Sequence, residues 1–93
     1  MIVYISGKIT GTTDYMERFA SAEKLLKARG FKVINPAKRN AKLPEGTTWE
    51  TYMRESIKML MKADAIYMLH GWRKSKGATL ERLLAYTLGM DIL

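Results

Sequence analysis

The chain has 93 residues, 47% of them hydrophobic and 27% charged, which is ordinary for a globular protein and predicts a single small domain over residues 1–93. A formal net charge of +7 favours an anionic partner, and the absence of cysteine excludes disulfides and thiolate metal sites. Neither a membrane-spanning run nor a basic signal-peptide segment is present, so we expect no membrane partner and a cytoplasmic location.

A short β-rich run opens the chain and leads into a loop that contains two glycines. Residues 2–5, Ile-Val-Tyr-Ile, predict a buried first strand. In the loop at residues 7–12, the glycines allow close backbone approach to a ligand, and Lys8 and Thr10 suit contact with a phosphate. The loop matches neither a Walker motif nor the dinucleotide-binding motif, so alone it is a weak indication of a site.

A helix, a second strand and a long loop are predicted next. Asp14 with Glu17 looks like a capping pair, and the helix that follows should end at Gly30. Residues 31–34 predict the second strand. Residues 37–46 predict a polar, basic loop that is long enough to act as a lid.

The next helix should begin at Thr47 with Glu50 and carry an apolar stripe. The stripe comprises Trp49, Met53, Ile57 and Leu60. Ser56 lies on the same side, so we expect it to point inward. Asp64 interrupts the pattern before the third strand, residues 65–69, and is expected to be structural.

Residues 71–81, G-W-R-K-S-K-G-A-T-L-E, form a polar loop between that strand and an amphipathic run at residues 80–88. This order places Glu81 in the first turn of a helix, near the carboxyl edge of the sheet, where free N–H groups and the helix dipole receive anions. Glu81 is therefore a candidate nucleophile or ribose ligand, or simply an acidic residue that favours a helix start. The helix is expected to end at Gly89, before a short fourth strand, and to bury Leu80, Leu83, Leu84, Thr87 and Leu88.

Strands and helices alternate throughout, which predicts an α/β fold: a flavodoxin-like or Rossmann-like three-layer sandwich with a parallel sheet of about four strands. Ligands bind such sheets outside the carboxyl ends of the strands. Gly7 to Gly11, Asn35-Pro36 and His70 to Gly77 should meet at that edge. The same loops carry several basic residues, namely Lys8, Lys38, Arg39, Lys42, Arg73, Lys74 and Lys76. This convergence favours a small anionic ligand, while nucleic acid remains a less favoured partner.

Two segments resemble a known superfamily. Residues 3–11, V-Y-I-S-G-K-I-T-G, resemble the opening strand and loop of nucleoside 2-deoxyribosyltransferase-like proteins, closest to the branch that cleaves deoxynucleoside 5′-monophosphates. Ser75-x-Gly77-x-x-x-Glu81 resembles the catalytic loop and helix of that superfamily. Over its whole length the chain is similar to a small branch found in phages and bacteria, whose G-W-x-x-S-x-G-A-x-x-E segment is matched at residues 71–81.

The resemblance implies roles for individual residues. The catalytic residues would be Glu81, the nucleophile that attacks the anomeric carbon of the sugar, and Tyr4, which would lie beside the sugar or base. Ser75 would contact the 5′-phosphate, within a phosphate-binding set of Ser6, Gly7, Lys8, Ile9, Thr10, Gly11, Ser75, Gly77 and Ala78. Candidate base or sugar contacts are Asn35, Ser56, His70, Gly71 and Trp72. No metal or cofactor is implied. Small chains of the superfamily usually associate, which implies a homo-oligomer whose neighbouring subunits complete each other's pockets.

One position departs from the superfamily pattern. Its members usually carry an aspartate where this chain has Ser56, eight residues before Asp64, and that aspartate helps to protonate the leaving base or to orient the sugar. Serine performs a general-acid role poorly. Glu55 is adjacent, but it is rotated by about 100° around the helix and should point elsewhere.

Three hypotheses follow. The first is an N-glycosidase or deoxyribosyltransferase with Glu81 as its nucleophile. The second, which Ser56 favours, is a non-catalytic protein that binds a nucleotide-type ligand, such as a signalling nucleotide sequestered during phage infection in the host cytoplasm. The third is a basic nucleic-acid-binding module, which strongly salt-dependent binding would reveal. Trp72 either stacks on a base or packs at a domain edge, and the lone His70 is expected to be an ordinary polar residue at a strand end.

Overall fold

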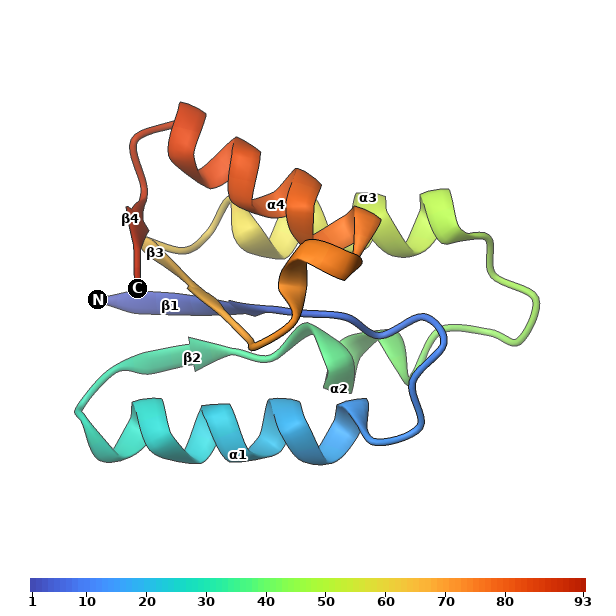
Figure 1. The fold of residues 1–93 in the computed structure, drawn as a ribbon, viewed down its shortest axis with the longest axis horizontal. Coiled ribbons are helices and arrows are strands. Elements are labelled where there is room, and N and C mark those ends of the chain that lie inside the picture. The colour runs from blue at the N-terminus through green and yellow to red at the C-terminus, as the bar shows by residue number, and fades with distance from the viewer.

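Four parallel strands form a single sheet in the order β2-β1-β3-β4, so that β1 lies between β2 and β3 (Figure 1). The structure is a computed structural model that describes residues 1–93. Its elements are β1 (Ile2–Ser6), α1 (Tyr15–Ala28), β2 (Lys32–Ile34), α2 (Pro36–Asn40), α3 (Trp49–Leu60), β3 (Ala65–Met68), the 3₁₀ helix η1 (Trp72–Lys74), α4 (Lys76–Thr87) and β4 (Asp91–Ile92). The predicted α/β fold with a parallel four-stranded sheet is confirmed.

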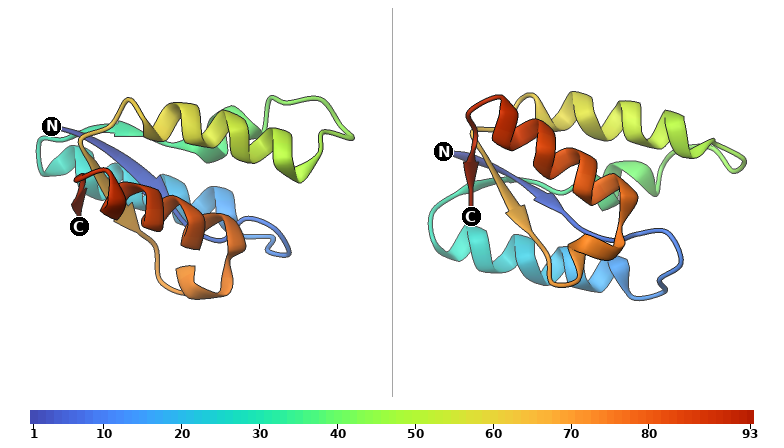
Figure 2. Two further views of the ribbon diagram at one scale, coloured as in Figure 1. Left: turned by 90° about the horizontal axis from the view of Figure 1, so that it is seen from above. Right: turned by 45° about the horizontal axis from the view of Figure 1, so that its top comes forward.

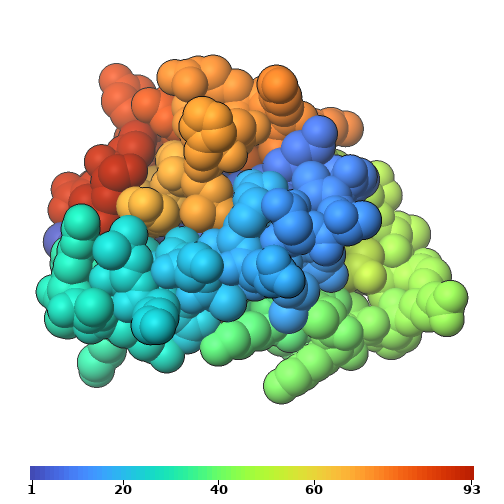
Figure 3. Space-filling model, turned by 60° about the horizontal axis from the view of Figure 1, so that its bottom comes forward, coloured from blue at the N-terminus to red at the C-terminus, as the bar shows by residue number.

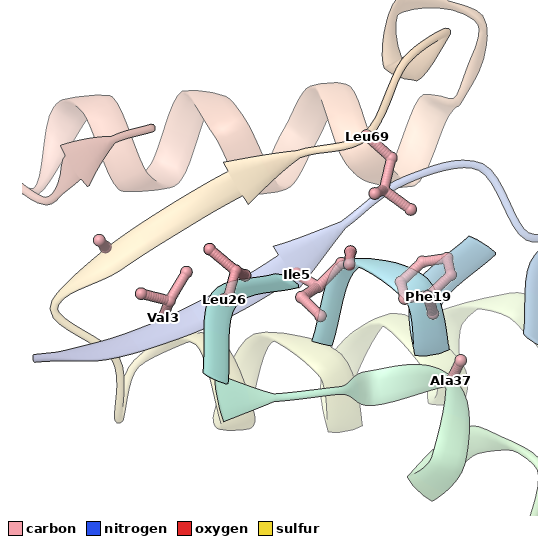
Figure 4. Close-up of a cluster of buried hydrophobic side chains, with 8 residues drawn as sticks. Val3, Ile5, Phe19, Leu26, Ala37 and Leu69 are labelled. Atoms are coloured by element: carbon pink, nitrogen blue, oxygen red, sulfur yellow. The ribbon is translucent and has the colours of Figure 1, made fainter. Parts of the chain in front are cut away.

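Helices cover both faces of the sheet and make three layers. Figures 1 and 2 show α1 against one face and α3 and α4 against the other. On the α1 side the core comprises Val3, Ile5, Phe19, Ala22, Leu26, Ala37, Ala65 and Leu69 (Figure 4). On the other side it comprises Tyr4, Leu60, Ile66 and Ala85. Because successive strand residues point to opposite faces, neighbouring residues of β1 belong to different clusters.

The chain changes direction across the sheet at β1. It moves from β1 to β2 on one side and then returns to β3 on the other side of β1. In parallel sheets the ligand site lies at such a switch point, outside the carboxyl ends of the strands. Figure 3 shows the segment after β1, in blue, and the segment around α2 and the start of α3, in green, at the same end of the molecule.

The loop predicted at residues 37–46 is partly wrong, because its first residues form the short helix α2 (Pro36–Asn40). Asn35 caps this helix by accepting a hydrogen bond from the Ala37 N–H at 3.0 Å, and Pro36 occupies the first turn. An asparagine cap followed by proline favours a helix start, and here that preference overrides the polar composition.

The last helix begins earlier than predicted. Residues 72–74 form η1, and α4 begins at Lys76 with Ser75 as its cap, so Glu81 lies in the second turn of the helix and not in the first. The predicted burial of the leucines is also wrong in part. Leu80 is 36% exposed, Leu83 59% and Leu88 58%, and Thr87 is exposed as well. The small residues Ala78 and Ala85 face the sheet instead, since they allow a close approach of helix to strand.

Two predicted caps differ in detail. Asp14 precedes α1 but makes no side-chain cap bond, and it forms an ion pair of 3.8 Å with Arg18 instead. The cap of α3 is Thr48 and not Thr47, and its side chain accepts from the Thr51 N–H at 3.2 Å.

Other helix and strand ends agree with the sequence prediction. Gly30 and Gly89 follow α1 and α4 with φ values of 89° and 76°, the left-handed conformation that glycine adopts without strain. Asp64 is structural as expected, because its carboxylate accepts from the Ile2 N–H at 2.8 Å and so fixes the start of β1. No helix has the length and apolar character that crossing a membrane requires.

Candidate functional site

A buried carboxylate lies between β1 and α4. The Tyr4 hydroxyl donates to Glu81 Oε2 at 2.5 Å, and the Ser6 hydroxyl donates to Glu81 Oε1 at 2.7 Å. Glu81 is 5% exposed, while Tyr4 and Ser6 are almost fully buried. Both carboxylate oxygens are therefore held by hydroxyl groups, at distances typical of hydrogen bonds to an ionised acceptor.

Strand and helix periodicity bring these three side chains together. Tyr4 and Ser6 are two residues apart in β1 and so point to the same face of the sheet, toward α4. On α4 the buried positions are Ala78, Glu81 and Ala85, spaced as one helix face. Glu81 thus occupies a core position of the helix, where the pattern would otherwise place an apolar residue.

The surroundings shift the acidity of both partners. Burial raises the pKa of Glu81, the hydrogen bonds from Tyr4 and Ser6 lower it in part, and the pKa settles at about 6 instead of 4.5. Burial, followed by the charge and hydrogen bond of Glu81, raises the pKa of Tyr4 well above 10.0, and the nearby Ser56 hydroxyl lowers it in part. At neutral pH Glu81 is therefore mostly ionised and Tyr4 is protonated, as their hydrogen bond requires. Perturbed pairs of this kind cluster at functional sites.

Glu81 and Tyr4 lie in the wall of a cavity of about 860 Å³, a volume typical of small-molecule sites. Its walls come from the end of β1, the loop after it, the N-terminal parts of α1, α3 and α4, and the short helix α2 with the turn that follows it. The aromatic side chains of Tyr15, Trp49 and Tyr52 contribute apolar surface. The cavity therefore offers one buried charge, several hydroxyl groups and an aromatic wall.

The rest of the cavity favours an anion. Three lysines, Lys8, Lys74 and Lys76, line it against two carboxylates, Glu50 and Glu81. Three helices, α1, α3 and α4, present their N-terminal ends, the positive ends of their dipoles, to the same space. A ligand with a negatively charged group is complementary to this environment.

The start of α4 supplies unpaired backbone donors. The Ser75 hydroxyl accepts from the Ala78 N–H at 3.1 Å, and the Ser75 carbonyl accepts from the Thr79 N–H at 3.0 Å. The N–H groups of Lys76 and Gly77 precede the first internal helix bond and have no backbone partner. A Cβ atom at Gly77 would lie 2.9 Å from the Met53 sulfur, so glycine also allows the close packing of α3 on α4.

Ser56 is a further buried polar residue of the cavity, on the side of Tyr4 away from Glu81. It is 4% exposed, it lines the cavity, and its hydroxyl neighbours Tyr4. Its oxygen accepts from Asn40 Nδ2 at 3.3 Å, whereas the other amide atom of Asn40, Oδ1, is buried without a hydrogen-bond partner. The prediction that Ser56 points inward is confirmed, and a side-chain acceptor without a partner lies beside it.

Comparison with known proteins decides the family. Residues 1–93 match the family described as a domain of unknown function, DUF4406. The chain belongs to this family. A search of curated protein sequences found no significant match.

The fold of this DUF4406 chain is similar to that of a 2-deoxyribosyltransferase. A 2-deoxyribosyltransferase from Bacillus psychrosaccharolyticus, described as a biocatalyst for nucleoside synthesis, superposes with a TM-score of 0.78. The alignment covers 99% of this chain and 69% of that chain, with 17% sequence identity. The predicted resemblance is confirmed at the level of the fold, while the phage branch and the activity stay predictions.

Most predicted site residues converge on the cavity. Those that line it are Tyr4, Gly7, Lys8, Ile9, Thr10, Ser56, Ser75, Gly77, Ala78 and Glu81. Ser6 binds Glu81 without lining the cavity, and Gly11 lies outside it in a turn with φ of 79°. Gly7 is needed for packing as well, because a Cβ there would lie 2.7 Å from Leu69 Cδ1.

Four residues predicted to contact base or sugar, Asn35, His70, Gly71 and Trp72, lie outside the cavity of this DUF4406 chain. Asn35 caps α2 and donates to Glu23 at 3.0 Å, so both the oxygen and the nitrogen of its amide have partners within the fold. His70 is exposed, beside a separate hollow along α1.

Gly71 and Trp72 belong to the surface at η1. Gly71 has φ of 83° where the chain enters the 3₁₀ helix. The Trp72 ring lies 4.6 Å from the Arg73 guanidinium and 5.0 Å from that of Arg82. These cation–π contacts agree with the packing interpretation of Trp72, which does not line the cavity.

Sequence reasoning missed several cavity residues. Tyr15, Tyr52, Trp49 and Asn40 all line the cavity, although Trp49 was predicted only as part of a helix stripe and Asn40 as part of a loop. A usable signal existed. In a parallel α/β fold the first turn of each helix lies at the ligand edge, so aromatic and polar residues there are site candidates.

Proposed function

We propose that this protein binds a nucleotide or nucleoside phosphate in the cavity and cleaves or transfers at its N-glycosidic bond, with Glu81 as the nucleophile. The observation that carries the proposal is the buried Glu81 carboxylate, whose two oxygens accept hydrogen bonds from Tyr4 and Ser6 beside a cavity of about 860 Å³. The deoxyribosyltransferase-like fold supports it.

Glu81 suits nucleophilic attack on an anomeric carbon. The carboxylate of a retaining glycosidase attacks as the base departs, and it holds the sugar as an ester until water or a second base arrives. Tyr4 and Ser6 fix the carboxylate in one orientation, and the pKa of about 6 leaves Glu81 ionised at neutral pH.

The lysines and the start of α4 suit the phosphate of the ligand. The Ser75 hydroxyl uses a lone pair as the helix cap, so its own hydrogen can still be donated to a phosphate oxygen. The N–H groups of Lys76 and Gly77 are free of backbone partners beside it. A nucleoside phosphate therefore fits this cavity better than an uncharged nucleoside.

The second candidate is a protein that binds a nucleotide-type ligand, including a signalling nucleotide, without cleaving it. Ser56 favours this alternative, because a neutral serine, and no second acid besides Glu81, stands at this position near Tyr4, where a proton donor for the leaving base would be useful. In both cases the same cavity and the same charges select the ligand.

We also propose a homo-oligomer. Leu83 is 59% exposed and Tyr86 70% exposed on the outer side of α4, an apolar surface that a second copy would cover. Light scattering on the eluting protein should give a mass above that of one 10.6 kDa chain. A Leu83→Lys variant should elute with a lower mass, and a wild-type protein that runs as a monomer at all concentrations would contradict the expectation.

The function is tested by incubating the protein with a panel of nucleoside 5′-monophosphates and measuring bound and released species by mass spectrometry. The wild type should release free base, while Glu81→Gln, which keeps the shape but not the charge, should release at least about 100-fold less. A glycosyl adduct on the peptide that contains Glu81 would identify the nucleophile. Glu55→Gln is the matched control, because Glu55 pairs with Arg39 and Lys58 outside the cavity.

The outcomes separate the candidates. Free base from the wild type and the control, but not from Glu81→Gln, supports the enzyme. A nucleotide that is retained and then released intact by heating supports the binding protein. If no nucleotide binds, both candidates fail, and strongly salt-dependent binding to long DNA or RNA becomes the next measurement.

A further inference from the structure

The cavity contains two carboxylates, and only Glu81 is buried. Glu50 lies in the first turn of α3 and is exposed. It precedes Ser56 by six residues, about 9 Å along the helix axis. The hydroxyl groups nearest to Glu81 belong to Tyr4 and Ser6, and both already donate their hydrogens to it. The nucleophile therefore has no second acid beside it.

The remaining proton donors lie elsewhere. Lys76 begins α4, five residues and about 7.5 Å along the axis from Glu81, and both Lys76 and Lys74 are exposed. Ser56 and Asn40, which line the cavity beyond Tyr4, are neutral. The site is built to hold a carboxylate nucleophile but not to protonate what that nucleophile displaces.

This asymmetry restricts the leaving group. A neutral purine or pyrimidine departs as an anion unless an acid protonates it. A base that is attached through a positively charged ring nitrogen departs as a neutral molecule and needs no proton. We propose that the substrate is a phosphorylated N-glycoside of this cationic class, with a pyridinium-type base. The inference rests on the proposed function and names its substrate class.

The reaction balances without an acid. A Glu81 carboxylate oxygen forms a bond to the anomeric carbon as the carbon–nitrogen bond breaks, and the bonding electron pair neutralises the ring nitrogen. The uncharged base leaves, and the sugar remains as an ester of Glu81. Water then attacks the same carbon, Glu81 departs as the carboxylate, and the excess proton passes to solvent.

The aromatic wall already holds a cation. The Lys76 ammonium lies 4.4 Å from the centre of the Trp49 ring, and both residues line the cavity. Aromatic faces attract planar cations as they attract ammonium groups. A pyridinium ring can take this position on Trp49, since the exposed Lys76 side chain can move to the phosphate. Tyr15 and Tyr52 add further aromatic surface.

Asn40 offers a contact that such a base can use. Its Oδ1 is the buried side-chain polar atom that has no partner in the structure, and Asn40 lines the cavity. An unpaired buried acceptor is costly, so a ligand N–H that reaches it gains affinity. A carboxamide on the ring supplies such a donor, which makes nicotinamide mononucleotide a suitable probe.

The test compares three compounds that share a ribose 5′-phosphate: nicotinamide mononucleotide, its reduced form with an uncharged ring, and adenosine 5′-monophosphate. Released base is measured by chromatography. The wild type should release nicotinamide at least about 100-fold faster than it releases base from either neutral compound. This factor is the rate enhancement that a general acid would otherwise contribute. Glu81→Gln should release base from each of them at least about 100-fold more slowly than the wild type releases nicotinamide.

Two substitutions at one position test the cause. Ser56→Asp places an acid beside Tyr4 and should raise adenine release at least about 10-fold, whereas Ser56→Asn, of the same shape but neutral, should not. Asn40→Leu should raise the KM for nicotinamide mononucleotide with less effect on kcat. Circular dichroism confirms folding, and if the Ser56 variants do not fold, the comparison of the three compounds with the wild type decides.

Each outcome has one meaning. Equal release of adenine and nicotinamide by the wild type would overturn this inference and leave the proposed glycosidase intact. Release of adenine alone would likewise overturn the inference and leave the proposed glycosidase intact. Release of no base from any compound would overturn the proposed glycosidase together with the inference. Fast release from the cationic compound only, with adenine release gained in Ser56→Asp, supports both.

Discussion

Tyr4 and Glu81 are 77 residues apart in the sequence and joined by a buried hydrogen bond of 2.5 Å. The bond ties the first strand to the last helix and orients the carboxylate toward the cavity. It also couples the two acidities, since the Tyr4 hydroxyl lowers the pKa of Glu81 and the Glu81 charge raises that of Tyr4.

Tyr4→Phe should therefore raise the pKa of Glu81 above its value of about 6, because the bond from Tyr4 is one of the two that offset burial. A hydrogen bond to a charged group contributes about 1.5–3 kcal/mol, so a rise of about one to two pKa units is expected. Carbon-13 NMR of the Glu81 carboxyl measures it. Tyr67→Phe, outside the cavity, is the control. An unchanged titration midpoint of Glu81 in Tyr4→Phe would show that the hydrogen bond from Tyr4 does not set the pKa of Glu81.

Glu81→Gln should be more stable than the wild type above pH 6. Folding raises the pKa of Glu81 from 4.5 to about 6, so the folded state binds the proton more tightly and the wild type loses stability as pH rises through this window. The wild type loses about 2 kcal/mol of unfolding free energy in this way. The neutral glutamine variant does not titrate and keeps that free energy. Urea unfolding from pH 4 to pH 8 tests this. A variant with the same pH dependence as the wild type would contradict it.

Glu23 should govern stability in acid. Burial tends to raise its pKa, but hydrogen bonds from Lys27, Lys38 and Asn35 overcome this and hold the pKa at about 2. The lysine ammonium groups lie 2.7 and 2.9 Å from its oxygens. Because the folded-state pKa is depressed, this contribution is complete above pH 4.5 and is lost as pH falls toward 2.

Glu23→Gln should lower the free energy of unfolding by about 2 kcal/mol at pH 7, a figure reduced for the exposure of the two lysines. It should also remove the decline of stability between pH 4.5 and pH 2 that the wild type shows. Thermal unfolding across this range measures both effects. Glu17→Gln on the exposed side of α1 is the control, and an equal effect of the two variants would argue against the ion cluster.

Gly7→Ala should destabilise the fold whether or not a ligand binds. An added Cβ would lie 2.7 Å from Leu69 Cδ1 and 2.9 Å from Leu69 Cβ, and the second of these atoms cannot rotate away. A cost of about 1–3 kcal/mol is expected from such overpacking. The double variant with Leu69→Ala removes the contact with Cδ1 but keeps that with Cβ, and it should lose less than the sum of the single variants. Simple additivity in urea unfolding would show that Gly7 and Leu69 do not conflict.

The sequence by itself determined the alternation of the four strands with the three long helices, but not α2 or η1, and it determined the edge of the sheet at which the site lies. The strands at Ile2 and Ala65 are short apolar runs, and Gly30 and Gly89 end their helices because they can adopt positive φ. These signals are local, so they can be read without knowing what packs against them. The strand-to-helix order then fixes where Glu81 and Gly7 must lie relative to the sheet.

Only the tertiary structure decided which side of α4 is buried and what Glu81 touches. The leucines predicted one buried face of α4, but the face that is buried consists of Ala78, Glu81 and Ala85. The two alanines are small enough to let the helix approach the sheet, and the buried acid has two hydroxyl partners there. Those partners lie in β1, and their position depends on how α4 docks on the strand. A charged residue at a core position breaks the apolar pattern, and such departures mark functional sites whose partners the sequence does not name.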